Sequence, residues 1–306
     1  MEWLVLGVSH GPQALQDLLL ALRGLNTLQL SLLIGLGALA AGFLGALTGL
    51  GGGVVIVPLL ALVFKIPLHY AIGASLVSVI ATSSGAAAAY VKEGYSNIRI
   101  GMFLEIATTF GALAGAYLAA HVVSTEAIAI IFGAVLIFSA YLSFRRHEEP
   151  AGAAQSHRLA RLLRLDGSYP TPQGPQPYHV SGVPGGFGLM FVAGVLSGLL
   201  GIGSGALKVL AMDQVMRIPF KVSTTTSNFM IGVTAAASAG VYLHRGYIDP
   251  GLSMPVMLGV LSGAFLGSKV LVGAKPKVLR LVFSAVILVL AVEMIYNALT
   301  GGFAHA

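Results

Sequence analysis

The chain contains no cysteine, so it forms no disulfide bond, holds no metal through thiolates and uses no cysteine nucleophile. Charged residues are also scarce, at 9% of 306 residues, whereas soluble domains carry roughly 25%. Hydrophobic residues make up 56% of the chain. Several apolar runs reach about 20 residues, the length that a helix needs to cross a bilayer. This composition predicts an all-α polytopic membrane protein.

Further absences narrow the function. The histidines show no metal-ligand spacing, no Gly-x-x-x-x-Gly-Lys-Ser/Thr motif for ATP hydrolysis is present, and no paired acid and base stands out. We therefore expect neither an enzyme nor a metal or cofactor. The net charge of +6 lies in short loops between apolar runs, which indicates membrane topology rather than binding of nucleic acid.

What the chain does have is an internal repeat at an offset of 152 residues, the separation of Gly49 from Gly201. Gly49–Gly53 (GLGGG) returns as Gly201–Gly205 (GIGSG). The same offset relates further pairs, namely Lys65–Pro67 and Arg217–Pro219, Ser75 and Ser227, Tyr90 and Tyr242, Gly111 and Gly263, and Gly115 and Gly267. Glycine-broken apolar segments at corresponding positions of two halves are typical of transporters whose substrate site lies between the repeats.

The repeat divides the chain into four parts. We expect an N-terminal interfacial segment at 1–29, repeat 1 at 30–144, a cytoplasmic disordered linker at 145–183 and repeat 2 at 184–298. The linker is rich in arginine and proline, a composition that cannot bury a core.

Lysine and arginine indicate that the two repeats are inverted. The linker and the loop with Lys92 and Arg99 are basic, as expected for cytoplasmic segments. In repeat 2, the basic loop is instead the one at 273–280, while the loop with Arg245 is nearly balanced. Each repeat therefore crosses the membrane an odd number of times.

A glycine-broken helical hairpin followed by three transmembrane helices fits that parity. The hairpin arms are expected at 30–48 and 52–64 in repeat 1, and at 184–199 and 206–213 in repeat 2. The sequence leaves open whether these hairpins are re-entrant or fully spanning.

The glycine breaks are the first candidate site. Backbone N–H groups freed inside a bilayer must line a cavity or bind something, and successive free N–H groups form a nest for an anion. The residues expected to form this substrate-binding site are Gly51, Gly52, Gly53, Gly203, Ser204 and Gly205. The alternative is close helix packing through small residues.

Polar side chains near the breaks extend the candidate site. Ser75, Thr226, Ser227 and Asn228 can donate hydrogen bonds to an oxyanion without burying a permanent charge, or can bond only to their own helix. Lys208 lies in an apolar run three residues after the second break, where repeat 1 has Ile56. A lysine there is expected to bind the anion or else to pair with Asp213.

Four further polar residues lie in or near the spans. Glu105 and Glu293 could couple transport to protons, and Tyr242, like Tyr90, is expected to anchor its helix at the membrane interface.

Around the two breaks the sequence resembles the TauE/SafE family of sulfite and organosulfonate exporters. The resemblance rests on Gly49–Gly53 with Pro58, Ala71–Ser75, Gly201–Gly205 and Thr225–Asn228, and covers about 35–298 without the linker. The chain departs from the family pattern at Ser204, where a glycine is expected, and at Lys208, where an apolar residue is usual. The resemblance implies a secondary transporter that exports small sulfur-containing anions, such as sulfite, sulfoacetate or other organosulfonates, across the bacterial cytoplasmic (inner) membrane.

The sequence leaves several alternatives open. An anion channel, or an importer of sulfate, thiosulfate or small carboxylates, has the same features. The partners are then a small anion, the lipid bilayer and a proton or sodium as coupling ion, without nucleic acid. A homodimer is one candidate assembly.

The inverted arrangement makes a topological prediction. Because the chain has no native cysteine, single cysteines at Lys92 and Arg245 report on their own positions. We expect an impermeant maleimide added outside cells to label one and not the other, and labelling of both from the same side would contradict inversion.

Overall fold

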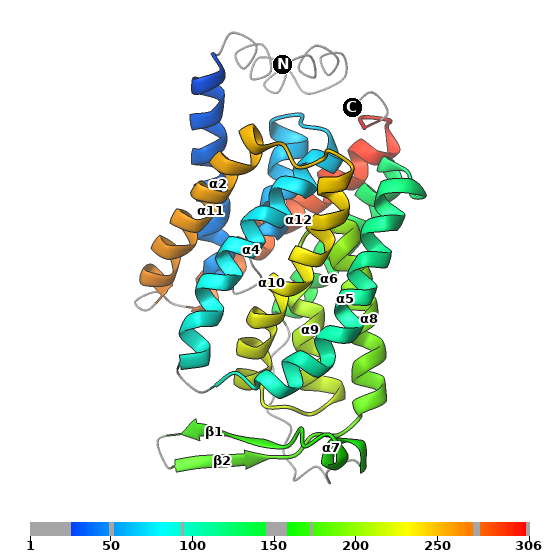
Figure 1. The fold of residues 1–306 in the computed structure, drawn as a ribbon. Coiled ribbons are helices and arrows are strands. Elements are labelled where there is room, and N and C mark those ends of the chain that lie inside the picture. Colours follow the sequence, from blue (N-terminus) through cyan, green and yellow to red (C-terminus); the bar gives the residue numbers. More distant parts are fainter. Residues whose placement is uncertain are drawn as a thin grey trace.

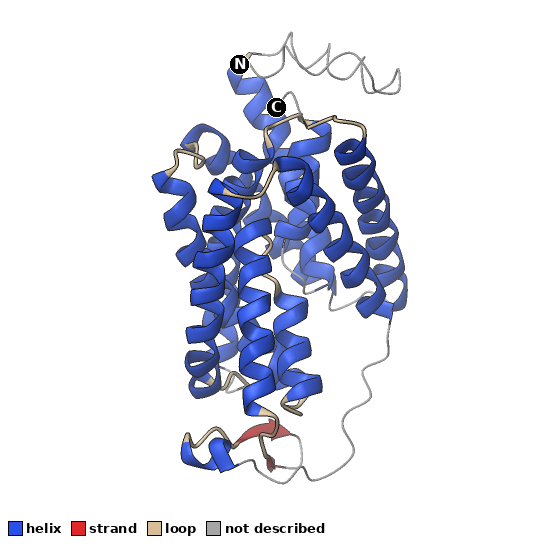
Figure 2. Ribbon diagram, turned by 90° about the vertical axis from the view of Figure 1, so that its right-hand side faces the viewer, coloured by secondary structure: helices blue, strands red, loops and turns tan. Residues whose placement is uncertain are grey.

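The structure, a computed structural model, describes residues 26–48, 52–92, 95–144, 158–171, 174–271 and 276–303. In these ranges it is a helical bundle with one small hairpin of strands at one end (Figures 1 and 2). The elements are α2 (Thr27–Thr48), α3 (Gly53–Pro58), η2 (Leu59–Val63), α4 (Leu68–Lys92), α5 (Ile98–His121), α6 (Thr125–Phe144), α7 (Arg158–Leu162), β1 (Gly167–Thr171), β2 (Gly174–Tyr178), α8 (Val183–Leu200), α9 (Gly205–Leu210), η3 (Ala211–Val215), α10 (Phe220–His244), α11 (Pro250–Leu271) and α12 (Pro276–Leu299). The predicted all-helical membrane class is confirmed for the bundle.

The two broken stretches fold as two-armed hairpins. The first arms are α2 and α8, and the second arms are α3 with η2 and α9 with η3. Each second arm has six α-helical and five π-helical residues, so it is about 16 Å long. That is about half of the roughly 30 Å hydrocarbon core, which places each break near mid-depth if the arms enter from a membrane surface.

The backbone itself repeats at the same offset as the sequence. The π-helical turn at Leu59–Val63 returns at Ala211–Val215. Two residues after each turn ends, a basic residue adopts a left-handed conformation, Lys65 with φ 53° and Arg217 with φ 56°. The correspondence therefore extends to unusual local geometry that apolar composition alone does not impose.

The helices of the two halves also pack as exchanged pairs. Helix α2 packs on α11 and α8 packs on α5, while α4 packs on α10 and α6 on α12. Glycines bring these helices together: a methyl group at Gly115 or Gly198 would collide with a carbonyl oxygen of the partner helix, as would one at Gly263. Small residues of this kind let backbones of membrane helices approach closely.

Contacts between loops group the elements at two ends of the bundle. At the end with the strands, here called the hairpin end, the N–H of Ser181 donates to the carbonyl of Met216 at 3.1 Å, so the second broken hairpin begins and finishes there. At the far end, His69 lies 3.0 Å from the carbonyl of Ala119, and Arg245 donates to the carbonyl of Ala120 at 3.2 Å. Helices α4 and α10 therefore run in opposite directions.

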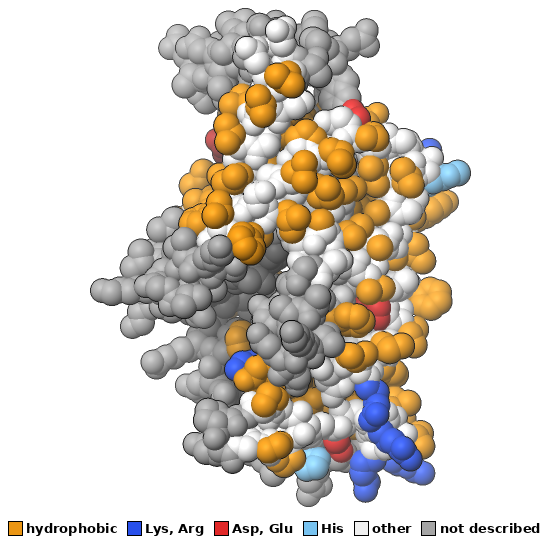
Figure 3. All heavy atoms as spheres, turned by 60° about the vertical axis from the view of Figure 1, so that its left-hand side comes forward, with side chains coloured by type: hydrophobic (Ala, Val, Ile, Leu, Met, Phe, Trp, Pro, Cys, Tyr) orange, Lys and Arg blue, Asp and Glu red, His pale blue; other side chains and the backbone are white. Residues whose placement is uncertain are grey.

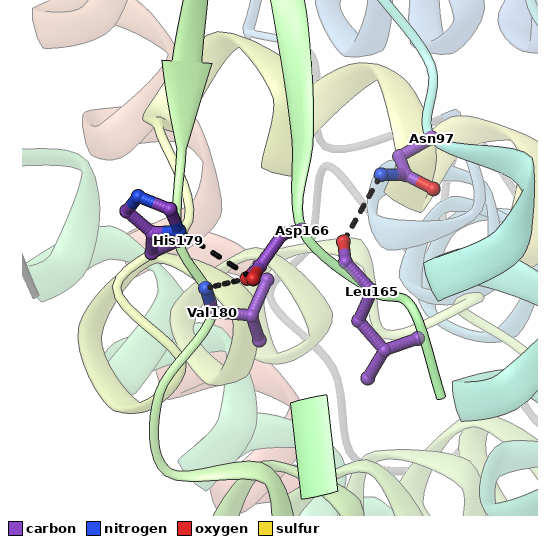
Figure 4. Close-up of polar contacts among 5 residues, drawn as sticks. All are labelled: Asn97, Leu165, Asp166, His179 and Val180. Atoms are coloured by element: carbon purple, nitrogen blue, oxygen red, sulfur yellow. Dashed lines mark hydrogen bonds and ion pairs between the residues drawn. The ribbon is translucent and has the colours of Figure 1, made fainter. Parts of the chain in front are cut away.

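The described part of the expected disordered linker is ordered, which corrects the prediction for 158–171 and 174–183. Helix α7 and an antiparallel β1–β2 hairpin dock on the start of α5, where Asn97 Nδ2 donates to Tyr178 Oη at 2.6 Å and lies 3.5 Å from the Leu165 carbonyl. In Figure 4, Asp166 closes the hairpin by accepting the N–H of Val180 at 2.8 Å and lying 3.4 Å from His179. Composition missed this order because these polar groups are paired rather than hydrated.

On the described surface, apolar and basic side chains are distributed as in a membrane protein. Apolar side chains cover the flank of the bundle, and lysine and arginine gather at the hairpin end (Figure 3). Large apolar side chains on the long helices are exposed, among them Leu36, Phe110 and Phe265. Four helices in the described ranges are long and apolar enough to cross a bilayer, with windows at Leu28–Gly45, Ile98–His121, Val183–Leu200 and Pro250–Gly267. The chain is a multi-pass membrane protein.

The glycine contacts predict a pair of substitutions with different effects in one helix. Gly198→Ala places a methyl group against the carbonyl of Ala112 in α5, so we expect a loss of about 1–3 kcal/mol in stability from overpacking. Gly188→Ala in the same helix meets open space. Thermal unfolding in detergent should show a lower melting temperature for Gly198→Ala and no decrease for Gly188→Ala. Equal melting temperatures of the two variants would contradict the close helix contact.

Candidate functional site

The two glycine breaks meet inside the bundle. A methyl group at Gly53, in the first hairpin, would lie 3.2 Å from the carbonyl oxygen of Gly201 in the second. Ser75 of α4 lies between them: its buried hydroxyl donates to the Gly201 carbonyl at 2.8 Å and stands 2.8 Å from the same methyl position. The convergence of the breaks that the sequence analysis expects is present at Gly53 and Gly201.

The second break has the backbone of a nest. Gly201, Gly203 and Ser204 have φ values of 69°, 71° and 45°, and Ser204 is the non-glycine residue among them. No carbonyl of the described residues accepts the N–H groups of Gly203, Ser204 or Gly205. Exposed N–H groups in this conformation can hold an anion.

The first break differs from that expectation. Gly52 has φ −64° in the right-handed helical region, so it does not need glycine for its conformation. It is close-packed instead, because a methyl group there would lie 2.5 Å from Val260 Cγ1. Gly51 lies outside the described residues. The packing alternative therefore explains Gly52.

The predicted serine and threonine side chains of α10 form hydrogen bonds with backbone groups. Ser227 donates to the carbonyl of Gly205 at 3.4 Å, and Thr226 accepts the N–H of Asn97 at 3.0 Å, at the start of α5. Half-buried Asn228 lies one turn before Gly232, the residue of α10 that contacts α4. In this structure Ser75 and Ser227 hold the second break, while Thr226 positions the loop at the hairpin end.

Tyr242 supports the same break from further along α10. Its side chain is fully buried, and its hydroxyl donates to the carbonyls of Gly198 and Leu199 at 3.2 and 3.5 Å, in the last turn of α8. The prediction of an interface anchor is wrong for Tyr242, because the phenol satisfies carbonyls that the helix leaves open at its end. The side chain of Tyr90 lies outside the description.

Lys208 belongs to a three-residue polar chain. Its ammonium donates to Thr234 Oγ1 at 2.5 Å, and Thr234 Oγ1 lies 2.7 Å from Glu105 Oε1. The three residues come from α9, α10 and α5, and their exposed fractions are 0%, 0% and 8%. The alternative partner, Asp213, accepts a hydrogen bond from Gln214 at 2.7 Å. Burying both charges is tolerable because each is the counter-charge of the other.

This region keeps polar atoms without partners. An ammonium has three N–H donors, and Lys208 uses one of them among the described residues. Five buried side-chain atoms of the described residues have no hydrogen bond, and three of them lie here: Glu105 Oε2 and the hydroxyls of Ser197, at the end of α8, and Ser204, at the break; the other two are the hydroxyls of Ser96 and Ser253. Such atoms are uncommon in folded proteins, so their gathering around one hairpin marks a candidate ligand site.

Sequence reasoning missed Thr234 and did not pair Glu105 with Lys208. A signal existed for Thr234, which lies seven residues after Ser227 and therefore on the same face of α10. The approach of α5 to α9 is not visible in the sequence. The groove found between the start of α5 and β1, of about 330 Å³, contains none of the predicted site residues.

Taken together, the fold and site define a helical membrane protein with a cationic site beside a broken hairpin. The family model for the sulfite exporter TauE/SafE matches residues 34–294. This chain therefore belongs to the TauE/SafE family.

Curated relatives are named as transporters. The "Probable membrane transporter protein YunE" of Bacillus subtilis (strain 168) is 28% identical over 270 residues, which are 85% of this chain and 96% of the relative. The "Probable membrane transporter protein MJ0441" of Methanocaldococcus jannaschii is 25% identical over 268 residues, 83% of this chain and 91% of the relative. No solved structure matches the chain. The chain is a membrane transporter of this family.

The bond across the two breaks predicts a stability effect. Ser75→Ala leaves the buried Gly201 carbonyl without its donor, at an expected cost of about 1–3 kcal/mol. Ser78→Ala, one turn away and equally buried, removes a bond to the carbonyl of Ser75 in the same helix, so a smaller cost is expected. Thermal unfolding in detergent compares the two, and an equal loss would refute a special role for Ser75.

Proposed function

We propose that this chain is a secondary transporter of small sulfur-containing anions, such as sulfite, sulfoacetate and other organosulfonates. It works in the cytoplasmic membrane by alternating access and serves in export, as the family description implies. The anion binds at the second break, between Lys208 and the backbone of Gly203, Ser204 and Gly205. The observation that carries this proposal is a fully buried ammonium with unused donors beside a left-handed glycine turn.

The chemistry of the site favours a tetrahedral or pyramidal oxyanion. Sulfite and sulfonate groups present several acceptor oxygens at one end, which suits the ammonium donors, the hydroxyl of Ser204 and the N–H groups that follow Gly201. The site is otherwise apolar, with Ile231 lying 2.8–2.9 Å from methyl positions at Gly203 and Gly205. A small organic substituent on sulfur is compatible with such a wall.

The packing supports alternating access by two inverted repeats. Helices α4 and α10 run in opposite directions, and the exchanged pairs α2–α11 and α8–α5 are compatible with two inverted repeats. Lys208 is 0% exposed, so an anion reaches it only after a conformational change. A continuously open anion channel is disfavoured by that burial; saturable counterflow in proteoliposomes distinguishes a transporter from a channel.

The decisive experiment is binding of sulfur anions to purified protein. A thermal-shift screen with sulfite, sulfate, thiosulfate, sulfoacetate, methanesulfonate, taurine and simple carboxylates identifies the ligand class, and calorimetry gives affinities. Lys208→Met should weaken binding by roughly 10- to 150-fold, the equivalent of about 1.5–3 kcal/mol for a hydrogen bond to a charged group. Lys208→Arg should recover only part of this loss, because a planar fork fits poorly where a compact ammonium bound.

Two variants serve as controls for the charge. Lys221→Met removes an exposed lysine that lies 3.8 Å from the ring centroid of Tyr95, so affinity should stay unchanged. Asp213→Asn changes the alternative partner of Lys208 and should also leave affinity intact. Unchanged affinity in Lys208→Met would remove the ammonium from the site, and a response to carboxylates alone would favour the importer of small carboxylates.

A further inference from the structure

Thr234 is placed so that its single hydroxyl can serve two protonation states of Glu105. Its oxygen lies 2.5 Å from Lys208 Nζ, 2.7 Å from Glu105 Oε1 and 2.8 Å from the carbonyl of Met230. A hydroxyl has one proton to donate and two lone pairs to accept with. It therefore cannot donate to Glu105 and to Met230 at the same time.

Each protonation state resolves this conflict in its own way. When Glu105 is ionised, Thr234 accepts from Lys208 and donates to Oε1. When Glu105 carries a proton on Oε1, Thr234 accepts from both Lys208 and Glu105 and donates to the Met230 carbonyl. Both arrangements satisfy the buried hydroxyl without moving a heavy atom, so protonation costs no hydrogen bond here.

The charged set occupies only one of two positions that the repeat relates to each other. The offset of 152 residues relates Lys208 to Ile56, Thr234 to Thr82 and Glu105 to Met257. Those counterparts lie on elements that pack in the corresponding way, α3 on α4 and α4 on α11. An apolar pair therefore fits the same architecture, and the fold does not require the two charged residues.

We propose that Glu105 is the proton-coupling site of this transporter, taking up one proton for each monovalent anion that binds at Lys208. This inference rests on the proposed anion site. In the free protein, Lys208 and Glu105 neutralise each other through Thr234. A bound anion becomes the counter-charge of Lys208 and would leave the glutamate as an unpaired buried charge, which is costly in a low-dielectric interior. A hydronium ion on the side of anion entry then transfers a proton to Glu105, so that one O–H bond breaks in the hydronium ion, which becomes water, and one forms at the carboxylate, leaving the site neutral.

Surrounding groups favour a proton over sodium. Lys208 is joined to Glu105 through the hydroxyl of Thr234. Helix α8, which packs on α5, has no ionisable side chain, and Asp213 of η3 is bonded to Gln214. The ionisable groups of α10 are Lys221 and His244 at its ends and Tyr242, whose hydroxyl is bonded to α8. A sodium ion at Glu105 would face an ammonium one hydroxyl away, whereas a proton adds no repulsive contact.

The test counts protons during anion binding. Methanesulfonate is the probe because its sulfonate stays ionised, so any proton taken up belongs to the protein. Calorimetry in two buffers of different ionisation enthalpy should give about one proton per anion, and affinity should fall as pH rises by up to about tenfold per pH unit. Replacing sodium by choline should change neither result.

Variants assign that proton to Glu105. Glu105→Gln should bind methanesulfonate without proton uptake and without the pH dependence. Glu293→Gln changes an exposed glutamate and should keep both. The double variant Lys208→Ile with Glu105→Met carries the residue types found at the repeat-related positions, Ile56 and Met257. It should therefore stay folded and bind no anion.

The outcomes separate the two proposals. Wild-type binding without proton uptake would overturn the coupling role and leave the anion site standing, and so would uptake that persists in Glu105→Gln. No binding of methanesulfonate to the wild-type protein would overturn the anion site and the coupling role together. Because the wild-type measurement alone can refute coupling, the inference remains testable even if a variant does not fold.

Discussion

Backbone groups at a helix break inside an apolar interior must find partners within the protein, and the rest of this structure follows from that constraint. At the second break the carbonyls of Gly198, Gly201 and Gly205 accept from Tyr242, Ser75 and Ser227. These donors belong to α4 and α10, which must therefore lie directly against the hairpin. The close contacts of α8 with α5 and of α2 with α11, made through glycine, bring the surrounding helices near enough to keep water from replacing those donors.

The constraint also explains why serine occupies the same register in both halves. Ser75 and Ser227 occupy the same position in the two repeats and are candidates for binding the substrate. Their hydroxyls bind backbone of the second break, and Ser75 does so from repeat 1 while it touches Gly53. A repeated polar residue in a membrane helix thus has two explanations, ligand binding and satisfaction of a broken backbone, and only the positions of the carbonyls distinguish them.

The sequence predicts local features of this protein better than the contacts between residues on different helices. Glycine runs marked both helix breaks, because several glycines within five positions destabilise a helix. Lys208 stood out because an ammonium in a span is costly. The partner of Lys208 could not be predicted, since Glu105 lies on a helix 103 positions earlier and meets it only through Thr234. The order at 158–171 and 174–183 was missed for a related reason: Tyr178 and Leu165 are held by Asn97, which composition does not reveal.

A nearly symmetric scaffold with one charged site has a mechanical consequence. Inverted repeats can exchange conformations to open toward either side, and a site on the axis between them stays in place. Lys208 and Thr234 come from repeat 2, whereas Glu105 comes from repeat 1, so any movement of one repeat against the other acts directly on the chain of hydrogen bonds joining them. The bond from Ser75 to Gly201 spans the same boundary. In the proposed mechanism, neutralising Glu105 removes the charge attraction across that boundary but leaves the serine bond intact, so protonation would loosen the contact between repeats without freeing the break. On that proposal, the same pair of charges sets both the occupancy of the site and the freedom of the two repeats to move.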